Sequence, residues 1–186
     1  MKIVFSVLFV FCFFSAVTQQ KKTGSVQSKY VSNDTLHWNK CRKLTWDDFK
    51  CMPDSTSTGM AGTSSGFITK STYSSDTTIS VVIIAVFYKN KSWVKNEYMD
   101  SATLKHEQGH FDITEICARR ANLALKNYKF NKATMKNDIN KIFYDFVDEQ
   151  NRIHDLYDKE TTKPINNKKQ REWDAKIAKW LQSNCE

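Results

Sequence analysis

The chain has 186 residues, of which 40% are hydrophobic and 26% charged, and its formal net charge is +8. This composition is typical of one globular domain; with 5 Gly, 2 Pro and no fixed-period repeat, it excludes collagen-like and repeat architectures. The basic residues over 126–141 and 159–179 alternate with acidic ones, which is typical of a solvated helical surface, so we expect no nucleic-acid partner.

The N-terminus has the layout of a secretory signal peptide. Lys2 precedes an apolar run over 3–14, which small and polar residues follow. The run is shorter than the roughly 20 residues of a membrane-spanning helix, so we expect no stable membrane insertion. Residues 1–18 are expected to be cleaved, which makes the protein secreted or periplasmic, and polar residues 19–35 to form a flexible lead-in. Cys12 lies inside the apolar run behind bulky residues, which argues against a lipoprotein.

Four cysteines remain after cleavage, and they are Cys41, Cys51, Cys117 and Cys185. An even number in an oxidising compartment indicates two disulfides, which can form in three ways. The short separation of the first two and the position of the last near the C-terminus favour Cys41–Cys51 and Cys117–Cys185. None of them has the C-x-x-C spacing of a structural zinc knuckle.

The folded domain is expected over 36–186, with strands first. Bulky apolar residues anchor a first unit at 36–49, and a loop rich in Ser, Thr and Gly follows at 51–66. Segments 67–73 and 77–88 have strand composition and a short polar connection, which predicts an antiparallel hairpin. The second of them contains ISVVIIAVFY, which indicates a buried central strand.

Three helices are expected after the strands. Asp100 or Ser101 can cap a first helix that runs to about residue 127, since apolar residues recur there at steps of three and four. Similar patterns predict helices over 132–157 and 167–181. The predicted fold class is therefore α+β, a small antiparallel sheet followed by three helices.

His106, Glu107 and His110 form the motif H-E-x-x-H inside the first predicted helix. Four residues turn a helix by about 400°, so both imidazoles lie on one face and can bind one Zn²⁺, while Glu107 can reach a zinc-bound water. Such a metal lowers the pKa of the water towards about 7, and the glutamate accepts its proton. The alternative is a chance match; the capped amphipathic helix in a single exported domain favours zinc.

Several further segments surround this motif in a fixed order: LTWDDFK at 44–50, Ser92 and Trp93, HEQGHFDITEICAR at 106–119, YDKET at 157–161, Gln170 and Trp173. Together they resemble the bacterial "domain of unknown function 922" family over roughly 36–181. That family is described as secreted zinc-dependent proteases, so the resemblance implies a zincin-like metallopeptidase domain. In the family a histidine usually follows YDKET, where this chain has Thr162, Lys163 and Pro164.

A catalytic zinc needs a third protein ligand. Asp112 and Glu115 lie on the motif's own helix but point away from the metal face, and no metzincin-type histidine follows. The ligand is therefore expected from the second helix or the loop after it. Asp158 is preferred, because it lies in the family-like YDKET segment shortly before a helix break. The alternatives that stay open are His154, Asp155 and Glu160.

Other residues near the motif have predicted roles. Tyr157 could donate its hydroxyl to the oxyanion of a tetrahedral intermediate, and the alternative is a core tyrosine. Asp112 and Glu115 are expected either to support a ligand imidazole by orienting it or to form ion pairs with Arg119 and Arg120. Gly109 is expected to let another group pack close to the helix.

The sequence therefore predicts a secreted zinc-dependent peptidase that hydrolyses peptide bonds, with Glu107 as general base. Its partner is a peptide or protein substrate that pairs with a strand edge within 67–88. The protein is expected to be a monomer. The alternative is a catalytically inactive exported binding or adhesion module of the same fold, with structural zinc or none.

Overall fold

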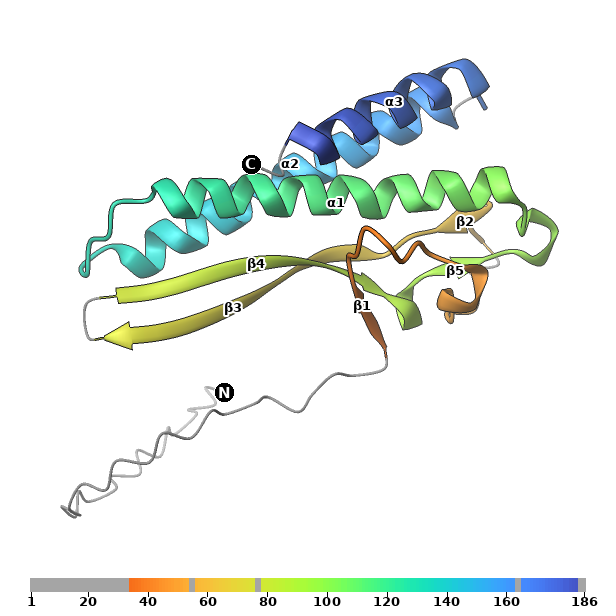
Figure 1. Cartoon of the computed structure of the whole chain (residues 1–186). Coiled ribbons are helices and arrows are strands. Elements are labelled where there is room, and N and C mark those ends of the chain that lie inside the picture. Colours follow the sequence, from red (N-terminus) through yellow and green to blue (C-terminus); the bar gives the residue numbers. More distant parts are fainter. Residues whose placement is uncertain (1–33, 54–55, 76–77, 163–164, 184–186) are drawn as a thin grey trace, which may run out of the picture. The chain divides into compact units, whose positions relative to one another are not determined.

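The computed structural model describes residues 34–53, 56–75, 78–162 and 165–183, and this part of the chain is α+β (Figure 1). Its elements are β1 (Thr35–His37), β2 (Ala61–Gly62), β3 (Ser65–Ser75), β4 (Thr78–Tyr88), β5 (Trp93–Val94), α1 (Ser101–Asn127), α2 (Met135–Thr161) and α3 (Asn167–Ser183). Strands come first and helices after, as predicted. No helix among the described residues combines the length and apolar character of a membrane span. The predicted signal peptide lies outside these residues.

The main sheet has the order β1-β4-β3, and both pairings are antiparallel. The predicted hairpin and the central position of β4 are confirmed. Ile83, Ala85 and Phe87 alternate along β4 and are buried, and Phe87 packs on Phe111 of α1 with ring centroids 5.7 Å apart. The strand is less enclosed than its apolar run suggests, because Val82 is 44% exposed.

α1 is the central helix of the fold and runs along the main sheet (Figure 1). The Asp100 carboxylate accepts hydrogen bonds from the backbone N–H groups of Ala102 and Thr103 at 2.8 and 2.9 Å, so Asp100 rather than Ser101 is the N-cap. α1 packs against β3, β4, α2 and α3, which buries residues around most of its circumference, including Ile113 and Ile116. A helix buried on several sides is a rigid platform for functional groups.

Several predicted boundaries differ from the structure; for example, β3 covers Ser65–Ser75 instead of 67–73. The second helix begins at Met135 instead of 132 and continues to Thr161, past the predicted end at 157. The predicted loop over 51–66 contains β2, which pairs with β5 in a separate two-stranded sheet. Strands of two residues have no periodicity that a sequence could reveal, because their formation depends on the neighbouring strand.

The structure differs from the predicted pairing of the first two cysteines, because Cys41 and Cys51 carry free thiols. The Cys41–Cys51 disulfide is not formed: the Cys41 N–H donates to the Asn39 side chain in an exposed turn, whereas the Cys51 N–H donates to the carbonyl of Ser92. Cys117 is fully buried, and burial raises the pKa of its thiol to about 12. Its predicted partner, Cys185, lies outside the described residues, so that pairing stays a prediction.

Candidate metal centre

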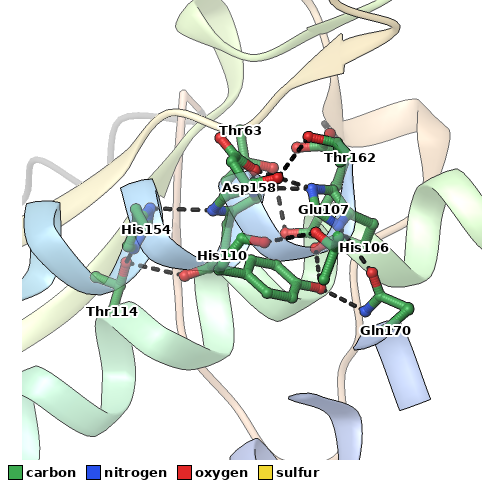
Figure 2. Close-up of polar contacts among 11 residues, drawn as sticks. Thr63, His106, Glu107, His110, Thr114, His154, Asp158, Thr162 and Gln170 are labelled. Atoms are coloured by element: carbon green, nitrogen blue, oxygen red, sulfur yellow. Dashed lines mark hydrogen bonds and ion pairs between the residues drawn. The ribbon is translucent and has the colours of Figure 1, made fainter. Parts of the chain in front are cut away.

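The histidines of H-E-Q-G-H lie one turn apart on α1, and a carboxylate from α2 meets them (Figure 2). The Nε2 atoms of His106 and His110 are 3.2 Å apart. Oδ1 of Asp158 lies 3.2 Å from Nε2 of His106 and 3.0 Å from Nε2 of His110. Three ligand-type atoms from two helices therefore converge on one point, and they are the three that the sequence analysis preferred.

The spacing of these three atoms fits a small divalent cation. In a tetrahedral zinc site with bonds of about 2.0–2.1 Å, neighbouring ligand atoms are about 3.3 Å apart, close to the observed 3.0–3.2 Å. Two imidazole lone pairs and a carboxylate oxygen repel one another at this distance unless a cation or a proton lies between them. Among the described residues, His106, His110 and Asp158 form a group that could hold a metal ion.

The other candidate ligands lie elsewhere. His154 contacts His110 but is not a member of the converging group. Asp155 is exposed to solvent. The Glu160 carboxylate accepts a hydrogen bond from Nε1 of Trp173 at 2.9 Å, which ties it to α3.

Hydrogen bonds within the group shift the pKa values of His106 and Asp158 in opposite directions. Burial acts to lower the pKa of His106, but its hydrogen bonds to Asp158 and Gln170 outweigh burial, so the pKa is raised. Burial acts to raise the pKa of Asp158, but hydrogen bonds from His106 and His110 dominate and hold it well below its usual range. Asp158 is thus an anionic ligand at neutral pH.

A residue of α3 orients His106. Oε1 of Gln170 lies 3.0 Å from Nδ1 of His106, and its Nε2 donates to the hydroxyl of Tyr157 at 2.6 Å. An acceptor at Nδ1 places the ring proton there and leaves the Nε2 lone pair for a metal. Sequence reasoning gave Gln170 no role in the site; its only signal was its place among the family-like segments.

Tyr157 is a buried support of the site and does not line it. Its side chain is fully buried and stacks on the His106 ring at a centroid distance of 4.5 Å. The hydroxyl donates to the carbonyl of His106 and accepts from Gln170. The geometry thus disfavours the predicted oxyanion role and supports the alternative, a core tyrosine.

A Cβ at Gly109 would lie 2.9 Å from Cζ of Tyr157, which confirms that this glycine permits close packing.

Glu107 is buried beside the three converging ligands. Its side chain is 4% exposed, and its Oε2 has no hydrogen-bond partner among the described residues. Burying a carboxylate oxygen without a partner costs free energy, so such atoms in native proteins point to a functional role. Figure 2 shows Glu107 next to His106 and Asp158.

The ligands and Glu107 line one cavity of about 640 Å³. The α1 and α2 residues form one wall, and residues 57–63, which include β2, form the other. Thr63 joins the two walls, because its hydroxyl donates to the carbonyl of Glu107 at 3.3 Å. None of the described residues that line the cavity comes from 67–88, so those strands supply no edge at this cavity, contrary to the prediction; β2 is the strand that lines it.

Asp112 and Glu115, the acids of α1 other than Glu107, have structural partners. The Glu115 carboxylate pairs with Arg119 at 2.7 Å, as predicted. Asp112 accepts hydrogen bonds from Nε1 of Trp38 at 2.7 Å and from Nε2 of Gln108 at 2.8 Å, and it pairs with Lys43 at 3.2 Å. Among the described residues no histidine contacts Asp112, so it does not orient a ligand imidazole, and its ion-pair partner is Lys43 instead of the predicted arginine. It faces away from the metal side of the helix.

Comparison with known proteins finds a family model that matches the centre of the chain. Residues 89–164 match the model of a family described as "Bacterial protein of unknown function (DUF922)". This match contains the H-E-Q-G-H and YDKET segments and covers the central part of the resemblance inferred over 36–181. No curated protein and no solved structure matches the chain. The family description names no activity, so a function has to be argued from the site.

Proposed function

We propose that this protein is a secreted, zincin-like, zinc-dependent peptidase. The observation that carries the proposal is the unpartnered Oε2 of Glu107, which is buried in the same cavity as three converging ligand atoms. His106, His110 and Asp158 would hold Zn²⁺. When bound, zinc supplies Lewis acidity, which lowers the pKa of water and polarises a carbonyl.

Glu107 supplies the proton transfer. An ionised carboxylate with a free oxygen can accept the proton of an attacking water, and Oε2 is that oxygen. The same carboxyl group can then give the proton to the amine that leaves. The wall of α1 and α2 excludes bulk water from one side of Glu107, which strengthens the interactions of its charge.

β2 is suited to bind an extended peptide. Met60 accepts from the Lys95 N–H at 3.0 Å, and Ala61 and Gly62 pair with Val94 and Trp93. In this antiparallel ladder every second residue directs its backbone groups to the partner strand, so the N–H and C=O of Ala61 point to the opposite edge. A peptide or protein substrate can pair with this edge at the cavity.

The alternative, a binding or adhesion module with structural zinc or none, explains the site less well. A structural zinc site has no use for a proton acceptor. The unpartnered carboxylate of Glu107 would then be an uncompensated cost. This observation favours hydrolysis.

Two measurements test the proposal. Mass spectrometry of the purified protein after zinc addition should find about one zinc per chain, and a His106→Ala variant should lose it. The zinc-loaded protein should cleave members of a fluorogenic peptide library, and a chelator should stop the cleavage. Absence of zinc from the wild-type protein would overturn the proposal. Zinc without any cleavage would favour the binding module.

A further inference from the structure

His154 of α2 is placed against His110 by a hydrogen bond between their Nδ1 atoms, which are 3.1 Å apart. The two rings are tilted by 40°, with centroids 4.8 Å apart. Figure 2 shows His154 on the side of His110 that is away from Asp158. A bond between two Nδ1 atoms needs one ring to donate and the other to accept.

The direction of this bond follows from the rest of the site. Nε2 of His110 points at the carboxylate of Asp158 and at Nε2 of His106. If Nε2 of His110 offers its lone pair to a metal, a neutral His110 carries its proton on Nδ1. This N–H then donates a hydrogen bond to Nδ1 of His154. His154 then carries its proton on Nε2.

Thr114 accepts a hydrogen bond from Nε2–H of His154 and so closes a cycle of hydrogen bonds. Its Oγ1 lies 3.4 Å from Nε2 of His154 and donates to the carbonyl of His110 at 3.2 Å. The hydroxyl of Ser65 lies 2.7 Å from the same Oγ1 and, since the Thr114 proton is already used, acts as a donor. The bonds therefore run from His110 to His154, from His154 to Thr114 and back to His110. Thr114 is fully buried, so water does not compete for its hydroxyl.

From this geometry we infer that His154 is a positioning residue that holds His110 in the Nδ1–H tautomer. The inference rests on the proposed zinc site and adds to it a neutral imidazole where such sites commonly use a carboxylate or a backbone carbonyl. It also changes the expectation for His154, which the sequence offered as a zinc ligand: it acts on the metal only through His110.

Zinc affinity, measured by competition with a chromogenic chelator, tests this role. His154→Leu removes the acceptor and should weaken zinc binding about 10- to 100-fold, the range for lost partners of metal ligands. His154→Asn keeps an acceptor near the position of Nδ1 and should retain most of the affinity. Asp155→Asn, at the exposed neighbouring position, is the matched control and should bind zinc as the wild type does.

Thr114→Val keeps His154 but opens the cycle, and it should weaken zinc binding by a few-fold. This variant carries the test if His154→Leu does not fold. Cobalt(II) substitution separates a positioning residue from a ligand: the visible spectrum of His154→Asn should match the wild type, and a changed spectrum would make His154 a ligand. Equal zinc affinity in the wild type, His154→Leu and Thr114→Val would overturn the inference. A wild type that binds no zinc would instead overturn the proposed function.

Discussion

Asp48 and Glu107 are both buried carboxylates, 3% and 4% exposed, and they differ in almost every other respect. Asp48 lies in a one-turn helix at Trp46–Asp48 and accepts two hydrogen bonds of 2.7 Å from Arg42 and one of 2.9 Å from the N–H of Thr45. Glu107 has an oxygen without any partner among the described residues. Burial alone therefore does not identify a reactive acid; the partners do.

The energetic consequence is opposite at the two sites. Burial acts to raise the pKa of Asp48, but the hydrogen bonds from Arg42 and Thr45 outweigh it, so the pKa is lowered and the ionised form stabilises the fold. At Glu107 one buried oxygen, Oε2, lacks a hydrogen-bond partner among the described residues, which costs free energy. The first acid stabilises the fold, whereas the second has an oxygen that, in the proposed function, is available for a proton.

The largest expected effect belongs to Glu107→Gln. The amide keeps the shape but accepts no proton, so hydrolysis of the best library peptide should fall by about 10²- to 10⁴-fold. Zinc content should stay at the wild-type level, because Glu107 is not one of the three proposed ligands. Retained hydrolysis at the wild-type rate would remove Glu107 from the mechanism.

Asp48→Ala should act on stability alone. It removes the charged hydrogen bonds to Arg42, but the Arg42 side chain is 44% exposed and can be rehydrated, so the loss should be about 2–3 kcal/mol. Denaturant unfolding followed by tryptophan fluorescence measures it. Zinc affinity of the folded variant should equal that of the wild type; a loss of zinc would mean that the two sites are coupled.

The pH dependence of stability sharpens the difference. Because the folded pKa of Asp48 is lowered, its contribution is complete above the unfolded pKa of about 3.9 and is lost as the pH falls through the folded pKa. Denaturant unfolding at a series of pH values from 6 to 2 should show a shallower acid loss in Asp48→Asn than in the wild type. Equal slopes would mean that Asp48 does not contribute to acid unfolding.

The sequence predicted those parts of the fold and site that local pattern decides. The spacing of His106 and His110 and the apolar periodicity after Asp100 predicted the helix and its metal face, and the β-branched run predicted β4. Asp158, inferred largely through a resemblance, lies within 3.2 Å of Nε2 of both histidines, where a third ligand could complete the proposed site.

What the sequence did not predict depends on contacts between distant segments. Gln170 reaches His106 only because α3 packs on α1, and β2 exists only because β5 pairs with it. The role of His154 depends on a bond to a residue 44 positions away. No periodicity or propensity encodes such partners, since tertiary packing selects them.

Gly109→Ala should have the next largest effect on stability. A Cβ would meet the Tyr157 ring, which is held between His106 and Gln170 and cannot retreat without moving both. Overpacking of this kind costs about 1–3 kcal/mol and here should also weaken zinc binding. An exposed position on the same helix, Ala102→Ser, is the control. Unchanged zinc affinity in Gly109→Ala would show that the Tyr157 support is not needed.

The smallest effect should come from Asp112→Asn, a third buried acid that lies on the same helix as Glu107. Its Oδ1 accepts from Trp38 and Gln108, and an amide oxygen can keep both bonds. The variant loses only the pair with Lys43, whose side chain is 53% exposed, and such pairs contribute about 0–1 kcal/mol. Zinc affinity should not change, because no histidine contacts Asp112. A tenfold loss of affinity would restore the role of orienting a ligand imidazole that the sequence suggested.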